Sequence, residues 1–190
     1  MKVIKDIDSF IKDNNITHIF IDIDGVIFHS CQAMIDILNE RYGGNFDGSD
    51  VTSWNFQCCY PNMTSEEIED TFNDPKFCDI VKPIDGALEF MDRYRDKIIL
   101  VTKANFENYA LKRKWFDDRG FNMPIIALPL NVSKGFINMD SITEYSIFID
   151  DSTENLIDSN ADFRVQFREF NDQKEREWQK GWGGLVMYQW

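Results

Sequence analysis

Residues 16–23 (ITHIFIDI) form a nearly continuous run of β-branched and aromatic side chains. A run of this length and composition is typical of a central parallel strand that is covered on both faces. It ends at Asp24-Gly25, which is a turn signal. Four further strand-like segments follow, at residues 98–102, 125–128, 146–149 and 163–167. The chain is therefore expected to build an α/β fold around a parallel sheet, because helical segments separate these runs.

Helical spacing of apolar residues predicts helices at residues 3–13, 31–42, 64–73, 85–95, 106–118 and 153–160. The interval between the first and second strands is unusual, because it is roughly 75 residues long where strand-to-helix loops commonly have 2–6. Since this interval contains helices of its own, we interpret it as an inserted subdomain. The predicted organisation is a main α/β core of residues 1–29 and 85–190, with a small helical subdomain inserted at residues 30–84.

The 190-residue chain carries a formal net charge of -13, and this balance limits the partners that it can bind. Such an acidic chain lacks the broad basic surface that a nucleic-acid backbone or an anionic membrane requires. A small anion is still a suitable ligand, since one metal ion and a few lysines can reverse the field inside a pocket. We therefore predict a small-molecule ligand and no nucleic-acid or membrane partner.

The cysteines and the N-terminal region predict a cytoplasmic protein. The four cysteines form no CxxC pair and are interpreted as reduced thiols: Cys31, Cys58, Cys59 and Cys78. The N-terminal residues lack the pattern of a signal peptide, and no apolar run approaches the length needed to cross a bilayer.

Polar side chains lie where three of the predicted strands end and in one later connection. They are Asp22 and Asp24, Thr102 and Lys103, Asp150 and Asp151, and Lys134. Open parallel sheets bind ligands at the carboxyl ends of their strands. We therefore expect these groups to meet at one site.

The chemistry of these groups points to phosphoryl transfer. Converging carboxylates repel one another unless a cation lies among them, and oxygen ligands favour a hard ion such as Mg²⁺. Beside that ion, Asp22 is a candidate nucleophile toward phosphorus, and Asp24 can protonate the leaving oxygen and later activate water. Thr102 and Lys134 would stabilise the charge on the phosphoryl oxygens.

Each motif also has a simpler interpretation when taken alone. Asp-x-Asp-Gly is a common turn, an acidic pair can cap a helix, and a single lysine is usually solvated. An EF-hand is excluded, because the remaining positions of its loop are absent. Four such motifs in this order and at strand ends are much less expected by chance.

This order of motifs resembles the haloacid dehalogenase superfamily of phosphatases, which has DxDG, then Thr or Ser, then Lys, then an acidic pair. Within that superfamily the chain is similar to the 5′(3′)-deoxyribonucleotidase family. The similarity rests on the phrase IDGALEFMDRY, on the helical insertion and on the IDD of the fourth motif. It covers nearly the whole chain.

The resemblance implies a Rossmann-like core with a small helical cap, and a Mg²⁺-dependent hydrolase of (deoxy)nucleoside monophosphates. It implies that Asp22 is the nucleophile and that Asp24 is the general acid and base. It further implies a metal held by Asp22, the backbone carbonyl of Asp24 and Asp151, with Asp150 a weaker or indirect ligand. The chain departs from the family at Lys103, where Ser is common.

Aromatic residues are candidates for contacting the leaving group. The family tends to place an aromatic six residues after Asp24, where this chain has Ser30, with Phe28 nearby. In the insertion, Trp54 and Phe56 are candidates for stacking on a nucleobase, the alternative being that they form the core of the subdomain.

Other interpretations of the function remain open from the sequence. The chain could act on another small phosphoester such as a sugar phosphate, process nucleic-acid ends, or bind nucleotides without turnover. The C-terminal tryptophans are expected to pack against the core, with a homodimer contact as the alternative.

Overall fold

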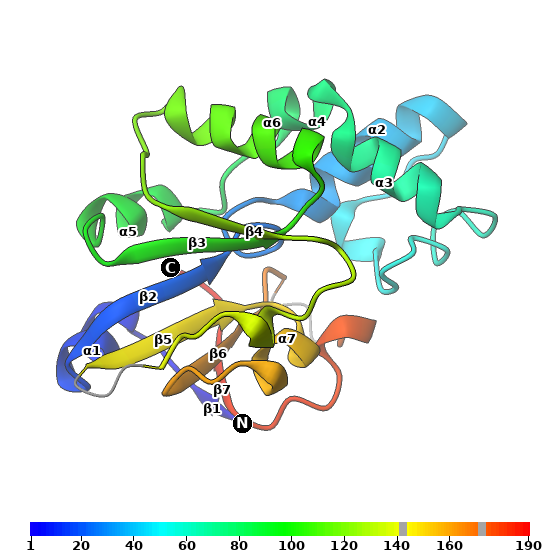
Figure 1. The fold of residues 1–190 in the computed structure, drawn as a ribbon. Helices are drawn as coiled ribbons and strands as arrows, with labels where there is room; N and C mark the ends of the chain where they lie inside the picture. Colours follow the sequence, from blue (N-terminus) through cyan, green and yellow to red (C-terminus); the bar gives the residue numbers. More distant parts are fainter. Residues whose placement is uncertain (141–143, 171–173) are drawn as a thin grey trace.

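A computed structural model describes residues 1–140, 144–170 and 174–190. Its centre is a seven-stranded sheet of order β1-β7-β6-β5-β2-β3-β4, in which all neighbouring strands are parallel (Figure 1). The strands are β1 (Lys2–Val3), β2 (Ile16–Asp22), β3 (Ile98–Lys103), β4 (Ile125–Leu128), β5 (Tyr145–Asp150), β6 (Phe163–Phe167) and β7 (Leu185–Met187). The predicted parallel α/β sheet is therefore confirmed.

The helices occupy the connections between these strands. The α-helices are α1 (Ile7–Asp13), α2 (Ser30–Tyr42), α3 (Ser65–Asn73), α4 (Pro75–Ile80), α5 (Ala87–Arg93), α6 (Phe106–Asp117) and α7 (Thr153–Asp158). Three short 3₁₀ helices are η1 (Gly48–Asp50), η2 (Lys134–Phe136) and η3 (Glu177–Gln179). Among the described residues, no helix combines the length and the apolar character that crossing a membrane would require.

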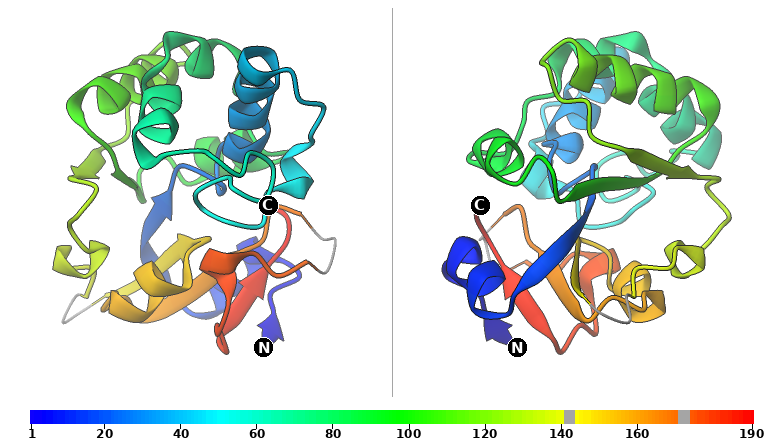
Figure 2. Two further views of the ribbon diagram at one scale, coloured as in Figure 1. Left: turned by 90° about the vertical axis from the view of Figure 1, so that its right-hand side faces the viewer. Right: turned by 60° about the vertical axis from the view of Figure 1, so that its left-hand side comes forward.

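The alternation of side chains along β2 divides the core between the two faces of the sheet. Ile19 and Ile21 belong to a large buried cluster that includes residues of α1 and α5, whereas Phe20 belongs to a second cluster with Leu156 of α7. Figure 2 shows α1 and α5 on one side of the sheet and α7 on the other. Burial on both faces explains why the run at residues 16–23 is almost entirely apolar.

The long connection between β2 and β3 folds into its own helical layer. Its helices α2, α3 and α4 contact one another, and α3 and α4 also contact α6, beyond the ends to which the strands point (Figure 1). At the start of α3, the Thr64 side chain accepts a hydrogen bond from the Glu67 amide, and Glu67 accepts one from the Thr64 amide. This reciprocal cap satisfies two amides that would otherwise lack partners.

Both ends of the chain differ from the sequence-based expectation. The helix predicted at residues 3–13 begins only at Ile7, and Lys2–Val3 instead forms strand β1. Strand β7 was not predicted, and it lies between β1 and β6. The Ile4 amide donates to the Val186 carbonyl at 2.8 Å. Strands of two or three residues are too short to show a period, so only pairing between the two ends of the chain reveals them.

Candidate active site

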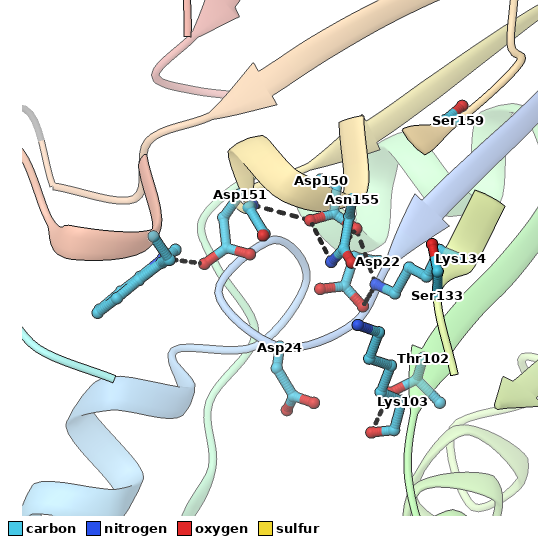
Figure 3. Close-up of polar contacts among 12 residues, drawn as sticks. Asp22, Asp24, Thr102, Lys103, Ser133, Lys134, Asp150, Asp151, Asn155 and Ser159 are labelled. Carbon is cyan, nitrogen blue, oxygen red and sulfur yellow. Dashed lines mark hydrogen bonds and ion pairs between the residues drawn. The ribbon is translucent and has the colours of Figure 1, made fainter. Parts of the chain in front are cut away.

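Three carboxylates converge at the carboxyl edge of the sheet. Asp22 ends β2, Asp150 ends β5, and Asp151 follows it; each offers an oxygen that lies within 4.8 Å of the other two (Figure 3). β2 and β5 are hydrogen-bonded neighbours, which brings together groups more than 100 positions apart in the sequence. The expected meeting of the first and fourth motifs is thus present in the structure.

Lys134 lies fully buried within this cluster. Its Nζ contacts Asp22 Oδ1 and Asp150 Oδ2, each at 2.7 Å. Burial opposes the charged form of Lys134, but Asp150 and Asp22 outweigh it and raise the pKa of the ammonium above its usual range. Its burial excludes a surface location for this lysine, and two carboxylates already pair with its ammonium.

Asp150 is saturated by hydrogen bonds from the protein. Besides Lys134, it accepts from the Ser152 amide at 2.8 Å and from Asn155 Nδ2 at 3.1 and 3.2 Å. Such a carboxylate is well suited to orienting Lys134, and it has less capacity left for a metal than Asp22 or Asp151. The weaker or indirect metal role that the resemblance implied for Asp150 stays a prediction.

Crowding of buried negative charge makes the cluster suitable for a cation. Burial, followed by repulsion from Asp150 and Asp24, raises the pKa of Asp22 to about 7, although Lys134 opposes the shift. Burial and repulsion from Asp150 and Asp22 likewise raise the pKa of Asp151 well above its usual range. A divalent cation would relieve both penalties, and the all-oxygen donor set fits Mg²⁺.

Gly25 allows the loop after β2 to pass close to Asp151. Its φ is +71°, a left-handed conformation that favours glycine, and a Cβ placed there would lie 2.7 Å from Asp151 Oδ2. The glycine of the Asp-x-Asp-Gly motif therefore allows the turn to form and leaves room for the Asp151 carboxylate.

The side chain of Asp24 does not join the carboxylate cluster, which corrects the expectation that Asp22 and Asp24 approach one point. Figure 3 shows it pointing away from Asp22, and it instead accepts from Ser30 Oγ at 2.8 Å and pairs with Lys112. The two side chains diverge because β2 ends at Asp22, so the backbone has already turned at Asp24. The metal role of its backbone carbonyl remains a prediction.

Lys112 is a residue of this site that the sequence analysis missed. It is fully buried on α6, where its Nζ contacts the Asp24 carboxylate and donates to Thr102 Oγ1 at 2.9 Å. A signal was present, because Asn108, Lys112 and Trp115 follow helical spacing and all lie on the buried face of α6. A lysine on such a face requires an anionic partner.

A cavity of about 510 Å³ opens beside the cluster. Of the residues predicted to act in the site, Asp22, Asp24, Trp54, Lys103, Lys134 and Asp151 line it. Figure 3 shows the Lys103 side chain pointing toward Asp22, and its ammonium forms no ion pair with any of the described residues. Acidic groups from Glu69, Glu154 and Glu177 add to the lining, so an anion would bind there more readily with a cation present.

Aromatic residues around the cavity differ in part from those predicted. Trp54 is 57% exposed and lines the cavity. Trp178, from the C-terminal region that was expected only to pack against the core or to form a homodimer contact, lines the cavity as well. Phe28 is instead fully buried and stacks on Phe116 with centroids 5.3 Å apart, and Phe56 is buried in the core. Neither ring lines the cavity, so the structure gives no support to substrate contacts by these two residues.

Comparisons with known proteins agree with this geometry. The sequence pattern of the family described as "5′ nucleotidase, deoxy (Pyrimidine), cytosolic type C protein" matches residues 14–180. No curated protein matches the chain.

Several solved structures share the fold. A haloacid dehalogenase-like hydrolase from Streptococcus pneumoniae has a TM-score of 0.59 at 8% identity, with 92% of this chain and 94% of that one covered. A putative beta-phosphoglucomutase from Thermotoga maritima has a TM-score of 0.54 at 13% identity, over 92% and 94% of the two chains. A haloacid dehalogenase family hydrolase from Deinococcus radiodurans, with bound phosphate and sodium, has a TM-score of 0.53 at 14% identity, over 92% of each chain. At these identities the likeness establishes the haloacid dehalogenase fold.

Gly25→Ala is expected to disturb Asp151 as well as the backbone. The left-handed backbone costs an added Cβ about 1–2 kcal/mol of stability. The clash should also displace the carboxylate and abolish any rise in melting temperature that Mg²⁺ produces. Gly120→Ala is the matched control, because Gly120 has a φ of +75° and no atom within 4 Å of the added Cβ. Urea unfolding and thermal melting with and without Mg²⁺ measure both effects; equal behaviour of the two variants would contradict the role of Gly25.

Lys112→Met is expected to lower the free energy of unfolding by about 3 kcal/mol, because it leaves the Asp24 carboxylate without its cation. Lys114→Met on the same helix is the control, since Lys114 is 71% exposed and forms a surface pair with Asp118. That pair should contribute less than about 0.5 kcal/mol. Urea unfolding of both variants measures the difference, and similar losses would show that the buried pair has no special weight.

Proposed function

The chain belongs to the family of 5′ nucleotidase, deoxy (pyrimidine), cytosolic type C proteins, which have the haloacid dehalogenase fold, and from this we propose a specific activity for it. We propose that it is a Mg²⁺-dependent phosphatase of (deoxy)nucleoside monophosphates that works through an aspartyl-phosphate. The observation that carries the proposal is the cluster of buried Asp22, half-buried Asp151 and buried Lys134 at the edge of a cavity large enough for a nucleotide.

In the proposed reaction, a carboxylate oxygen of Asp22 attacks phosphorus and the bond to the leaving oxygen breaks. Asp24 gives its proton to that oxygen. It then takes a proton from the water that attacks the aspartyl-phosphate, which releases inorganic phosphate and regenerates Asp22. Since Asp24 contacts Lys112 and Ser30 in the structure, its side chain must turn toward the leaving group before it acts.

Charge on the phosphoryl group would be balanced by the lysines and by the metal. Asp22 and Asp151 would hold Mg²⁺, with Asp150 behind them, and the ion would supply electrostatic stabilisation to the phosphoryl oxygens. The 2.7 Å contact between Lys134 Nζ and Asp22 Oδ1 supports a role for this ammonium in binding a group attached to Asp22. Lys103, which lines the cavity from the adjoining strand β3, would bind a further oxygen. Thr102 was predicted to do the same, but it is fully buried and does not line the cavity.

The leaving group would lie under the insertion. We propose that residues 30–84 act as a cap on a core of residues 1–29 and 85–190, and that Trp54 provides an apolar surface for the nucleobase. Trp54 faces the cavity and stacks on Phe72 with centroids 6.4 Å apart and ring planes 24° apart. A cytosolic location accords with the family description and is proposed with it.

Asp22→Asn should reduce phosphate release by about 10³-fold or more, because an amide is a poor nucleophile. Release of phosphate from a panel of deoxynucleoside and ribonucleoside monophosphates in Mg²⁺ is the measurement, with Asp13→Asn on the exposed side of α1 as the control. The covalent intermediate can be tested by quenching the reaction in acid and measuring phosphate that remains attached to the protein. It should be present on the wild-type chain and absent from Asp22→Asn. Turnover that survives in Asp22→Asn would mean that another residue attacks.

The same panel distinguishes the alternatives. Release from sugar phosphates but not from nucleotides would replace the proposed substrate class and keep the chemistry. Nucleotide-dependent stabilisation without phosphate release would instead indicate a binding module.

Trp54→Ala is expected to raise KM for a nucleoside monophosphate about tenfold, since stacking on a base is worth about 1–3 kcal/mol. The change for β-glycerophosphate, which has no base, should be much smaller. Tyr42→Ala is the control, because Tyr42 is also an exposed aromatic of the insertion but does not line the cavity. Steady-state kinetics on both substrates are the measurement. An equal change for the two substrates would exclude base stacking by Trp54.

A further inference from the structure

We propose that Trp178 is a positioning residue that holds the Asp151 carboxylate in its metal-binding orientation and links it to the wall of the substrate cavity. The inference rests on the proposed function, because it takes Asp151 as a ligand of the metal.

The first observation is the direct hydrogen bond between these two side chains. Trp178 Nε1 donates to Asp151 Oδ2 at 2.6 Å. An indole N–H donates only, and a bond to a carboxylate is stronger than one between neutral groups. Oδ2 also lies against Gly25, where an added Cβ would be 2.7 Å away. Oδ2 thus lies between the indole and the turn at Gly25, and Figure 3 shows the other carboxylate oxygen on the side of Asp22.

The second observation is that the segment carrying Trp178 is attached to the loop that carries Trp54. The Glu177 amide donates to the Thr52 carbonyl at 2.9 Å, and the Trp54 amide donates to Glu177 Oε2 at 3.4 Å. The rings of Trp54 and Trp178 meet edge-to-face, with centroids 6.0 Å apart and planes at 77°. Both rings line the cavity. The C-terminal segment therefore bridges the metal side of the cavity and its aromatic wall.

The third observation is that η3 is anchored to the sheet as well. Gln166 Nε2, on strand β6, donates to the Gln179 carbonyl at 3.2 Å, and both side chains are buried. This anchor gives the indole a fixed point from which to orient Asp151. Partners that orient a metal ligand in this way typically contribute 10- to 100-fold to metal affinity.

Trp178→Phe tests the proposal, because it removes the N–H donor and keeps an aromatic ring. Binding of Mn²⁺, as a spectroscopic substitute for Mg²⁺, is measured by electron paramagnetic resonance without substrate. We expect the dissociation constant to rise about 10- to 100-fold. Trp182→Phe is the matched control, since the Trp182 N–H donates to the Leu185 carbonyl at 2.8 Å in the same C-terminal region. Its affinity should stay within about twofold of wild type.

A second measurement uses the wild-type chain and does not depend on the variant folding. In a spectrum of ¹⁵N-labelled indoles, the Trp178 signal should move when Mg²⁺ is added, while the Trp182 signal stays in place. The signals can be assigned by substituting the other tryptophans one at a time.

The outcomes separate this inference from the proposed function. Unchanged Mn²⁺ affinity in Trp178→Phe, or a Trp178 signal that ignores bound Mg²⁺, overturns the positioning role even if nucleotides are hydrolysed. Weakened binding in Trp178→Phe alone supports it even if no nucleotide in the panel is a substrate. Absence of metal binding by the wild-type chain overturns this inference together with the Mg²⁺ requirement.

Discussion

The structure depends on keeping several buried or half-buried carboxylates together at the edge of one cavity. Burial and mutual repulsion both raise the pKa of Asp22 and Asp151, so the site is costly to the fold until positive charge balances it. Lys134 provides one part of that charge from within the protein, through contacts of 2.7 Å with Asp22 and Asp150. The remaining imbalance is what suits the site to a divalent cation. The same uncompensated negative charge that would destabilise the metal-free chain would therefore favour binding of the cation.

The same balance of charge separates the two aspartates of the first motif. Asp22, at the end of a strand, is enclosed with other acids, whereas Asp24 lies past the strand end and pairs with the buried Lys112. Two carboxyl groups with different surroundings can take different roles in one reaction, as nucleophile and as proton carrier. Because Lys112 also contacts Thr102, a movement of Asp24 would affect the strand end that is proposed to bind phosphate.

The end of the chain contributes more to the site than a strand at the edge of the fold would suggest. It adds β7 to the sheet, and just before that strand it places Trp178 against both Asp151 and Trp54. The carboxylates therefore come from the ends of β2 and β5, while the insertion and the C-terminal segment add residues to the wall of the cavity beside them. Changes far from the sheet edge in sequence can alter metal binding, since they move a hydrogen-bond donor of one ligand.

The sequence by itself determined the parallel α/β sheet and the meeting of Asp22, Asp151 and Lys134, because strand-length apolar runs and polar strand ends are local patterns. It did not predict β1 and β7, whose two or three residues have no period of their own. Tertiary structure alone decided which way Asp24 points, that Phe28 and Phe56 are buried away from the cavity, and that Trp178 enters the site. These features arise from contacts between segments distant in sequence. Their energies depend on burial and on neighbouring charge, which no local pattern records.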